Sequence, residues 1–87
     1  MGRPMLWPPD VPRRVSVLGA TGSVGTSTLD LIGRNTQRYS VVALTAQSNV
    51  GALAVAARAH RASLAVIGDA SLYGELKGRL SGTGIGV

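Results

Sequence analysis

The strongest constraint on the fold is a glycine-rich run near the amino end, Gly19–Gly25, which reads GATGSVG. It follows an apolar run, Val15–Leu18, and precedes a stretch with the spacing of a helix. Glycines at its first, fourth and seventh positions allow a sharp turn, expose backbone N–H groups to a pyrophosphate, and let the helix pack closely on the strand. The run therefore predicts a strand, a turn and a helix that together bind the phosphates of a dinucleotide.

The glycine spacing departs from the usual G-x-G-x-x-G pattern, because the middle glycine stands one place later. A glycine-rich hairpin is the alternative, and it would be followed directly by another alternating strand. A helix is expected instead, from about Ser23 to Gly33, and a second apolar strand follows it. A Walker loop is excluded, because no Lys-Ser/Thr pair follows the last glycine. The inner face of the expected helix is assigned to Val24, Thr28, Leu31 and Ile32.

The rest of the chain alternates between expected strands and helices. Further strands are predicted over residues 40–46 and 63–67, after a first strand over 13–18. A second helix runs from Val50 to about His60, and residues 85–87 begin a fourth strand. Three β-α units and this strand start predict an α/β fold, an incomplete Rossmann-like doubly wound parallel sheet. The third helix is assigned to the segment after its cap Asp69, with the periodic leucines Leu72, Leu76 and Leu80.

Local signals add detail to these elements. The continuous apolar core of the first strand predicts burial on both faces. Gly33 and Asn35 are expected to end the first helix in the left-handed region. Asn49 is a good N-cap for the second helix, and His60 stands at its carboxyl end, where an imidazole meets the helix dipole. This capping role is favoured over catalysis, since no nucleophile or carboxylate constellation surrounds His60.

The amino-acid composition indicates the cellular compartment of the protein and the kinds of partner it can bind. Residues 1–12 contain all four prolines, which predicts a flexible leader before a domain over 13–87. The leader has neither the apolar run of a signal peptide nor a myristoylation motif, and the absence of cysteine fits a reducing cytoplasm. The net charge of +5 comes from basic residues spread along the chain without interleaved aromatics. We therefore expect neither nucleic acid nor membrane as a partner.

The end of the second expected strand indicates which nucleotide is bound. NAD-binding domains place an acidic residue there, whereas this chain has Ala46, Gln47, Ser48 and Asn49. With no carboxylate to repel a 2′-phosphate, and with Ser48 and Asn49 able to donate hydrogen bonds to it, NADPH is predicted over NADH. Arg58 or Arg61 is a candidate source of positive charge, although both lie a helix away in the sequence.

The residues GATGSVGTSTLD, from Gly19 to Asp30, and VVALTAQSNV, from Val41 to Val50, resemble the amino-terminal domain of 1-deoxy-D-xylulose 5-phosphate reductoisomerase. The resemblance extends from about Arg13 to the end. It implies an enzyme, a homodimer, that uses NADPH and Mg or Mn to rearrange and reduce its sugar phosphate to 2-C-methyl-D-erythritol 4-phosphate for isoprenoid synthesis. The resemblance implies cofactor contacts at Thr21, Gly22, Ser23, Val24 and Asn49. Ser48 is added to this set because its hydroxyl can donate a hydrogen bond to the 2′-phosphate.

The same resemblance places the family's catalytic residues and metal ligands beyond Val87, so this chain is expected to hold neither and to be inactive alone. Asp30, Asp69 and Glu75 belong to separate expected helices, where solvated or capping roles are favoured.

Two alternatives stay open at this stage. Aspartate-semialdehyde dehydrogenase and acylphosphate reductases also carry Gly-Ala-Thr-Gly-x-x-Gly loops, but they lack the continuation Ser27–Asp30. A non-catalytic nucleotide-binding module, complete at this length, is the second alternative, and the end of the chain within an expected strand speaks against it.

Overall fold

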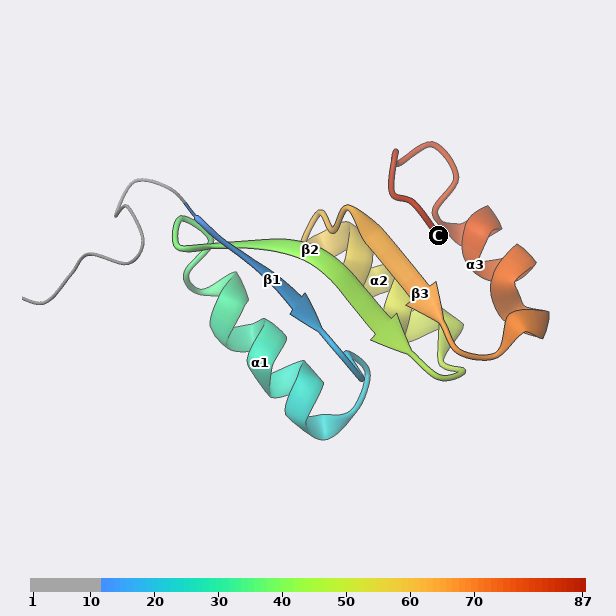
Figure 1. Cartoon of the computed structure of the whole chain (residues 1–87), viewed down its shortest axis with the longest axis horizontal. Coiled ribbons are helices and arrows are strands. Elements are labelled where there is room, and N and C mark those ends of the chain that lie inside the picture. Colours follow the sequence, from blue (N-terminus) through green and yellow to red (C-terminus); the bar gives the residue numbers. More distant parts are fainter. Residues whose placement is uncertain (1–11) are drawn as a thin grey trace, which may run out of the picture.

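The computed structural model describes residues 12–87, so the expected leader lies almost entirely outside the described residues. Strands and helices alternate along them (Figure 1), and the expected elements are confirmed with small shifts of their ends. In chain order the elements are β1 (Arg13–Val17), α1 (Ser23–Gly33), β2 (Tyr39–Ala46), α2 (Val50–Ala59), β3 (Leu64–Ile67), the 3₁₀ turn η1 (Ala70–Leu72) and α3 (Tyr73–Arg79).

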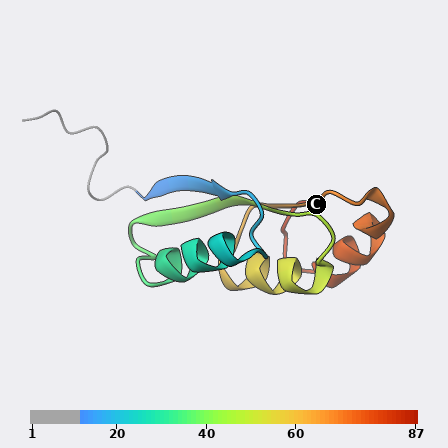
Figure 2. The ribbon, with the colours of Figure 1, turned by 90° about the horizontal axis from the view of Figure 1, so that it is seen from below.

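The three strands form one parallel sheet in the order β1-β2-β3. Figure 2 shows α1 and α2 beneath the same face of this sheet, while α3 lies beyond β3. A β-bulge interrupts the pairing of β1 with β2, where Val15 pairs with Val41 but Ser16 pairs with Ala43. Within residues 12–87 the molecule is therefore one half of a doubly wound α/β sheet, with helices on a single face.

The expected fourth strand is present only as a single parallel bridge between Leu64 and Gly86. Two backbone hydrogen bonds hold it, from Ala65 N to Gly86 O at 2.8 Å and from Gly86 N to Ser63 O at 2.9 Å. This segment thus extends the sheet at the β3 edge, and β1 keeps an open edge among the described residues.

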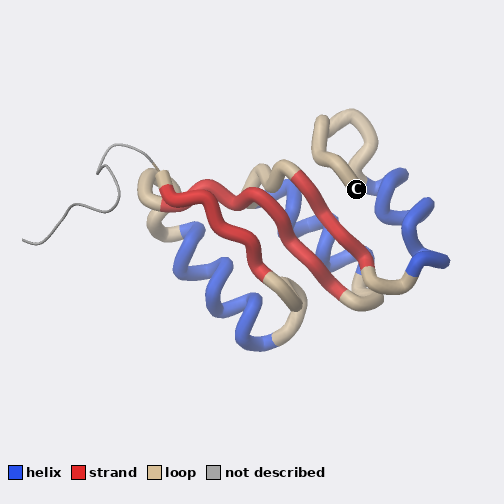
Figure 3. Tube along the Cα trace, viewed as in Figure 1, coloured by secondary structure: helices blue, strands red, loops and turns tan. Residues whose placement is uncertain are grey.

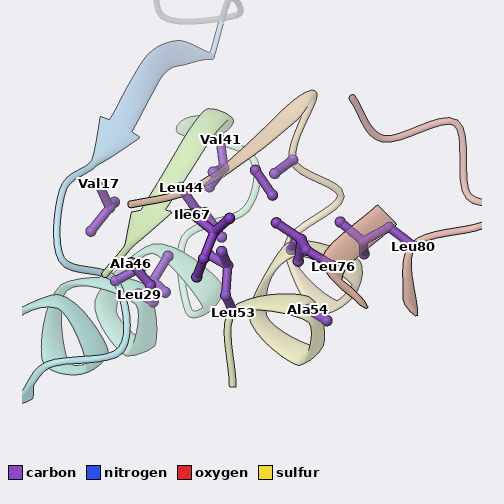
Figure 4. Packing of buried hydrophobic residues seen from close by; sticks show 14 of the residues in the cluster. Val17, Leu29, Val41, Leu44, Ala46, Leu53, Ala54, Ile67, Leu76 and Leu80 are labelled. Carbon is purple, nitrogen blue, oxygen red and sulfur yellow. The ribbon is translucent and has the colours of Figure 1, made fainter. Parts of the chain in front are cut away.

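The core lies between the sheet and the helices, as Figure 4 shows. Leu44 of β2, Leu53 of α2 and Leu76 of α3 are fully buried there. Burial of one such leucine stabilises the folded state by about 1.5 to 3 kcal/mol. Because the three leucines come from the sheet and from two helices, their packing holds these elements together. Leu76 and Leu80 are buried and Leu72 packs against the core, which confirms the leucine period of the third helix.

Two predicted burial patterns are wrong. In β1 only Val17 is buried, and Leu18, just beyond the strand, is 78% exposed. The reason is that helices cover only one sheet face, so β1 lacks the two-sided burial of a central strand. Of the inner face predicted for α1 only Ile32 is buried; Val24 is 80% exposed, Leu31 is 58% exposed and Thr28 is also exposed. The other buried residues of α1 are Gly25 and Leu29. The helix is turned this way because Gly25 must face the turn that precedes it.

The helix α1 ends at Gly33 as predicted, but the left-handed conformation expected at this end is wrong, because neither Gly33 nor Asn35 has a positive φ. The C-cap residue Arg34 is right-handed, with φ −81°, and the Asn35 side chain donates a 2.9 Å hydrogen bond to Leu31 O. An unsatisfied helix carbonyl thus finds its partner in a side chain, and the left-handed turn is not needed.

Gly25 generates the first prediction, because a Cβ there would overlap Gly19 O and lie 2.8 Å from Ala20 Cα. We expect Gly25→Ala to destabilise the protein by about 3 kcal/mol, since rigid backbone would have to move. Urea unfolding followed by circular dichroism measures the change. Gly78→Ala is the matched control: a Cβ there meets nothing within 4 Å, and this change should stabilise α3 by roughly 0.5 to 1 kcal/mol. Equal effects of the two substitutions would contradict the argument.

Candidate functional site

The carboxyl ends of all three strands point to one edge of the sheet, and the loops that follow them lie next to one another there (Figure 3). Gly68 N donates to Ala46 O at 2.8 Å, and Asp69 N donates to Gln47 O at 2.9 Å. These bonds tie the loop after β2 to the loop after β3. In open parallel sheets, ligands bind outside the carboxyl ends of the strands, so this edge is the candidate site.

Thr45 fixes the glycine-rich loop to the end of β2. Gly19 N donates to the Thr45 hydroxyl at 3.0 Å, and Ala20 N donates to the Thr45 carbonyl at 2.7 Å. Gly19 has φ +65°, a left-handed conformation that a side chain would strain. The turn is therefore held from outside by one threonine, a residue for which the sequence analysis assigned no role.

The amino end of α1 lies at the candidate site and has no side-chain cap. Its N-cap residue is Gly22, which has no side chain to accept from the first turn. The first N–H groups of a helix have no partner within the helix, and they carry the positive end of its dipole. Thr21 is half-buried beside this turn, while Ser23 and Val24 are exposed. An anion at this position would meet unoccupied donors.

The end of β2 brings the second group of predicted residues to the same edge. Ser48 and Asn49 are both exposed there. Asn49 is the N-cap of α2, as expected, and its Oδ1 accepts from Ala52 N at 3.2 Å. This bond uses only the oxygen of the side-chain amide, so the two Nδ2 donors are available to a ligand.

Gln47 contributes a contact that sequence reasoning did not find. Its side chain lies so close to Gly68 that a Cβ on Gly68 would overlap Gln47 Oε1. The side chain of Gln47 thus covers the junction between β2 and β3. No local signal reveals this contact, because the two residues follow different strands and meet only after the sheet forms.

Asp69 lies at the end of β3 beside this junction and caps η1, rather than α3 directly. Its Oδ1 accepts from the Ser71 hydroxyl at 2.6 Å and from Ser71 N at 3.0 Å. These hydrogen bonds, that from the hydroxyl foremost, lower the pKa of Asp69 from its ordinary value of 3.8. A lowered pKa in the folded state means that this stabilisation is present at neutral pH and is lost as acidification protonates the carboxylate.

The remaining candidates lie away from this edge. Arg58 and Arg61 stand at the far end of α2, about 15 Å along a ten-residue helix from its N-cap, so neither guanidinium belongs to the strand-end site. His60 is the C-cap residue of α2, and its ring lies against Gly33. Residues 12–87 contain no cluster of three metal-ligating side chains, and no helix among them combines the length and apolar character needed to cross a membrane.

Comparison with known proteins identifies the family. Residues 15–87 match the family model for 1-deoxy-D-xylulose 5-phosphate reductoisomerase. The chain belongs to this family. A reductoisomerase from Zymomonas mobilis is 60% identical over 74 residues, which cover 85% of this chain, and one from Sinorhizobium medicae is 51% identical over 80 residues, which cover 90%.

A solved structure supports the same assignment. The reductoisomerase from Zymomonas mobilis, in complex with NADPH, superposes with a TM-score of 0.85 and 59% identity over 86% of this chain. The fold of the reductoisomerase family is thereby confirmed for these residues. The chain spans only 19% to 20% of the length of these relatives.

Proposed function

We propose that this chain is the NADPH-binding portion of a 1-deoxy-D-xylulose 5-phosphate reductoisomerase, an oxidoreductase that forms 2-C-methyl-D-erythritol 4-phosphate for isoprenoid precursors. The observation that carries the proposal is the uncapped amino end of α1, held by Thr45 at the strand-end edge, in a chain 59% identical to a reductoisomerase solved with NADPH. The match to the reductoisomerase family model favours this function over the two alternatives, an aspartate-semialdehyde dehydrogenase and a non-catalytic nucleotide-binding module.

The pyrophosphate of the cofactor is proposed to bind at the start of α1. Ser23 and Val24 open α1, and the first N–H groups of a helix have no partner within it, whereas the Gly22 N–H donates to Gly19 O at 3.1 Å. Thr21 and Gly22 precede this turn and complete the proposed contact with the pyrophosphate. A Cβ on Gly22 would lie 3.5 Å from Gly19 O, which the fold tolerates, so glycine at this position is explained by a ligand that needs the space. We infer that the pyrophosphate lies against Gly22.

The 2′-phosphate of the cofactor is proposed to bind directly after β2. The residues after β2 carry no carboxylate, and Ser48 and the Asn49 amide offer hydrogen-bond donors. The Asp69 carboxylate lies one strand further along, where it is engaged with Ser71. An anionic 2′-phosphate at Ser48 and Asn49 therefore meets donors in place of the repulsive carboxylate typical of NAD sites.

The parent enzyme is proposed to use Mg or Mn, but residues 12–87 do not fit a metal site. Asp30 pairs with Arg34 at 3.1 Å, Glu75 pairs with Arg79 at 3.1 Å, and Asp69 caps η1. We therefore assign catalysis and metal binding to parts of the parent other than these residues. We further propose that residues 13–87 form part of its cofactor domain, and that the parent is a cytoplasmic homodimer.

Gly22→Val should abolish NADPH binding in the intact enzyme while preserving the fold, because the valine methyl groups would occupy the space of the pyrophosphate. Fluorescence titration of NADPH measures the affinity, and circular dichroism checks the fold. Gly78→Ala, on α3, is the control and should bind NADPH normally. Unchanged affinity in Gly22→Val would refute the phosphate-loop assignment.

Ser48→Asp should shift the cofactor preference toward NADH by about 1 to 2 kcal/mol, since one hydrogen bond is replaced by repulsion of the 2′-phosphate. Binding constants for NADPH and NADH, measured side by side, test this. Ser48→Ala separates the two effects: it removes the hydrogen bond without adding charge, so its shift should be smaller. A wild-type enzyme with equal affinities for the two cofactors would exclude the proposed selectivity.

The 87-residue chain by itself should show no reductoisomerase activity, because the three acidic residues within residues 12–87 form no cluster of carboxylates for a divalent ion. The measurement is NADPH oxidation with 1-deoxy-D-xylulose 5-phosphate and Mn, with the intact enzyme as positive control. Turnover by the purified chain would overturn the assignment of catalysis to the rest of the parent.

A further inference from the structure

The turn that ends α2 uses an arginine where glycine is preferred. Ala62 N donates to Ala57 O at 3.0 Å and Arg61 N donates to Arg58 O at 3.3 Å, the two hydrogen bonds of a Schellman motif. Arg61 has φ +52°, and it is the one residue other than glycine with positive φ within residues 12–87. Because an L side chain strains this conformation, the arginine side chain at this position calls for an explanation other than local stability.

Arg61 opens onto a hollow of about 550 Å³ at the end of the sheet where β3 begins. The turn before β3 forms one wall and the loop after α3 forms the other; Gly86 N donates to Ser63 O at 2.9 Å where the two meet. Figure 1 shows both segments near the start of β3, away from the strand ends that form the cofactor site. The residues that line this arginine hollow are Arg58, Arg61, Ala62, Ser63, Thr83, Gly84 and Ile85.

Two arginines line the arginine hollow and no acidic residue does. The ion pairs among residues 12–87 join other residues, so neither Arg58 nor Arg61 is neutralised by one of them. Arg58 is anchored, because its Nη1 donates to Arg79 O at 3.1 Å at the end of α3. This bond uses one of the five N–H groups of Arg58, so the others can serve a ligand.

We propose that the arginine hollow binds a phosphate-type oxyanion between Arg58 and Arg61. Guanidinium groups bind phosphate oxygens through paired, charge-assisted hydrogen bonds, and the exposed Ser63 hydroxyl is a further donor in the wall. Arg58 and Arg61 stand three residues apart and both border the arginine hollow, so an oxyanion there is attracted by two positive charges. Binding of the oxyanion explains why this strained position holds an arginine. A glycine there would relax the turn, but it would also remove one of the two cations.

The test is a titration of the intact parent enzyme with inorganic phosphate at constant ionic strength, followed by NMR of the backbone amides and by thermal unfolding. The wild type should show saturable shifts at Arg61 and Ser63 and a phosphate-dependent rise in its unfolding midpoint. Amides of Gly22 and Ser23 report separately on phosphate at the cofactor site, so failure here and failure of the proposed function are distinguishable.

Arg61→Gly is the decisive variant, because it should fold better and bind worse. Without phosphate its unfolding midpoint should rise by a few degrees, as the strained turn relaxes, while phosphate affinity at the hollow falls about tenfold or more. Arg34→Ala, which removes an arginine outside the hollow, should leave the phosphate response at Arg61 and Ser63 unchanged. A wild-type response retained in Arg61→Gly, or reproduced by chloride, would overturn the proposal.

A second arm uses glycerol 3-phosphate in place of inorganic phosphate. Saturation of the Arg61 and Ser63 shifts by both compounds supports recognition of a phosphoryl group, including one on a larger molecule. Saturation by inorganic phosphate alone supports a site for the free ion. Saturation by neither compound excludes the site.

Discussion

The close approach of Gly25 to the backbone of Gly19 and Ala20 is the contact on which the rest of this structure depends. It sets how near α1 lies to β1, and it determines that Leu29 and Ile32 face the sheet. It also brings the uncapped start of α1 to the strand-end edge. Two hydrogen bonds from the loop to Thr45 fix that geometry to the next strand. One glycine without a Cβ therefore positions both the core and the site.

The parallel arrangement of the strands places the proposed cofactor-binding groups at one edge of the sheet and several arginines at the opposite edge. Every β-to-α loop lies at the carboxyl edge, where the first turn of α1, Ser48 and Asn49 present hydrogen-bond donors. Every α-to-β turn lies at the amino edge, and there the chain carries arginines, among them Arg38 before β2 and Arg61 before β3. Cations near helix carboxyl ends also interact favourably with the helix dipole. Residues that are scattered in the sequence thus gather at one edge of the fold, where they are remote from the proposed cofactor.

Local signals in the sequence were sufficient to predict where helices and strands lie, but not which of their faces is buried. Element boundaries are set by caps and by glycine: Asn49 caps α2 as predicted, while Asp69 caps η1 directly before the third helix. Burial of Val24 and of both faces of β1 was predicted wrongly, because periodicity gives the spacing of a face without saying which neighbour covers it. The end of α1 at Gly33 was predicted correctly, but its left-handed conformation was not, because the Asn35 side chain supplies the hydrogen bond that a left-handed backbone would otherwise provide.

The sequence by itself determined the glycine loop, the alternation of strands and helices, and the absence of an acidic residue after β2, because each depends on neighbouring residues. The tertiary structure alone decided that Thr45 holds the loop, that Gln47 covers Gly68, and that Gly86 pairs beside β3. It also decided that Arg58 and Arg61 line one hollow with the loop after α3. These contacts join residues distant in the chain or on different elements, and their geometry exists only after the sheet has set the register of its strands.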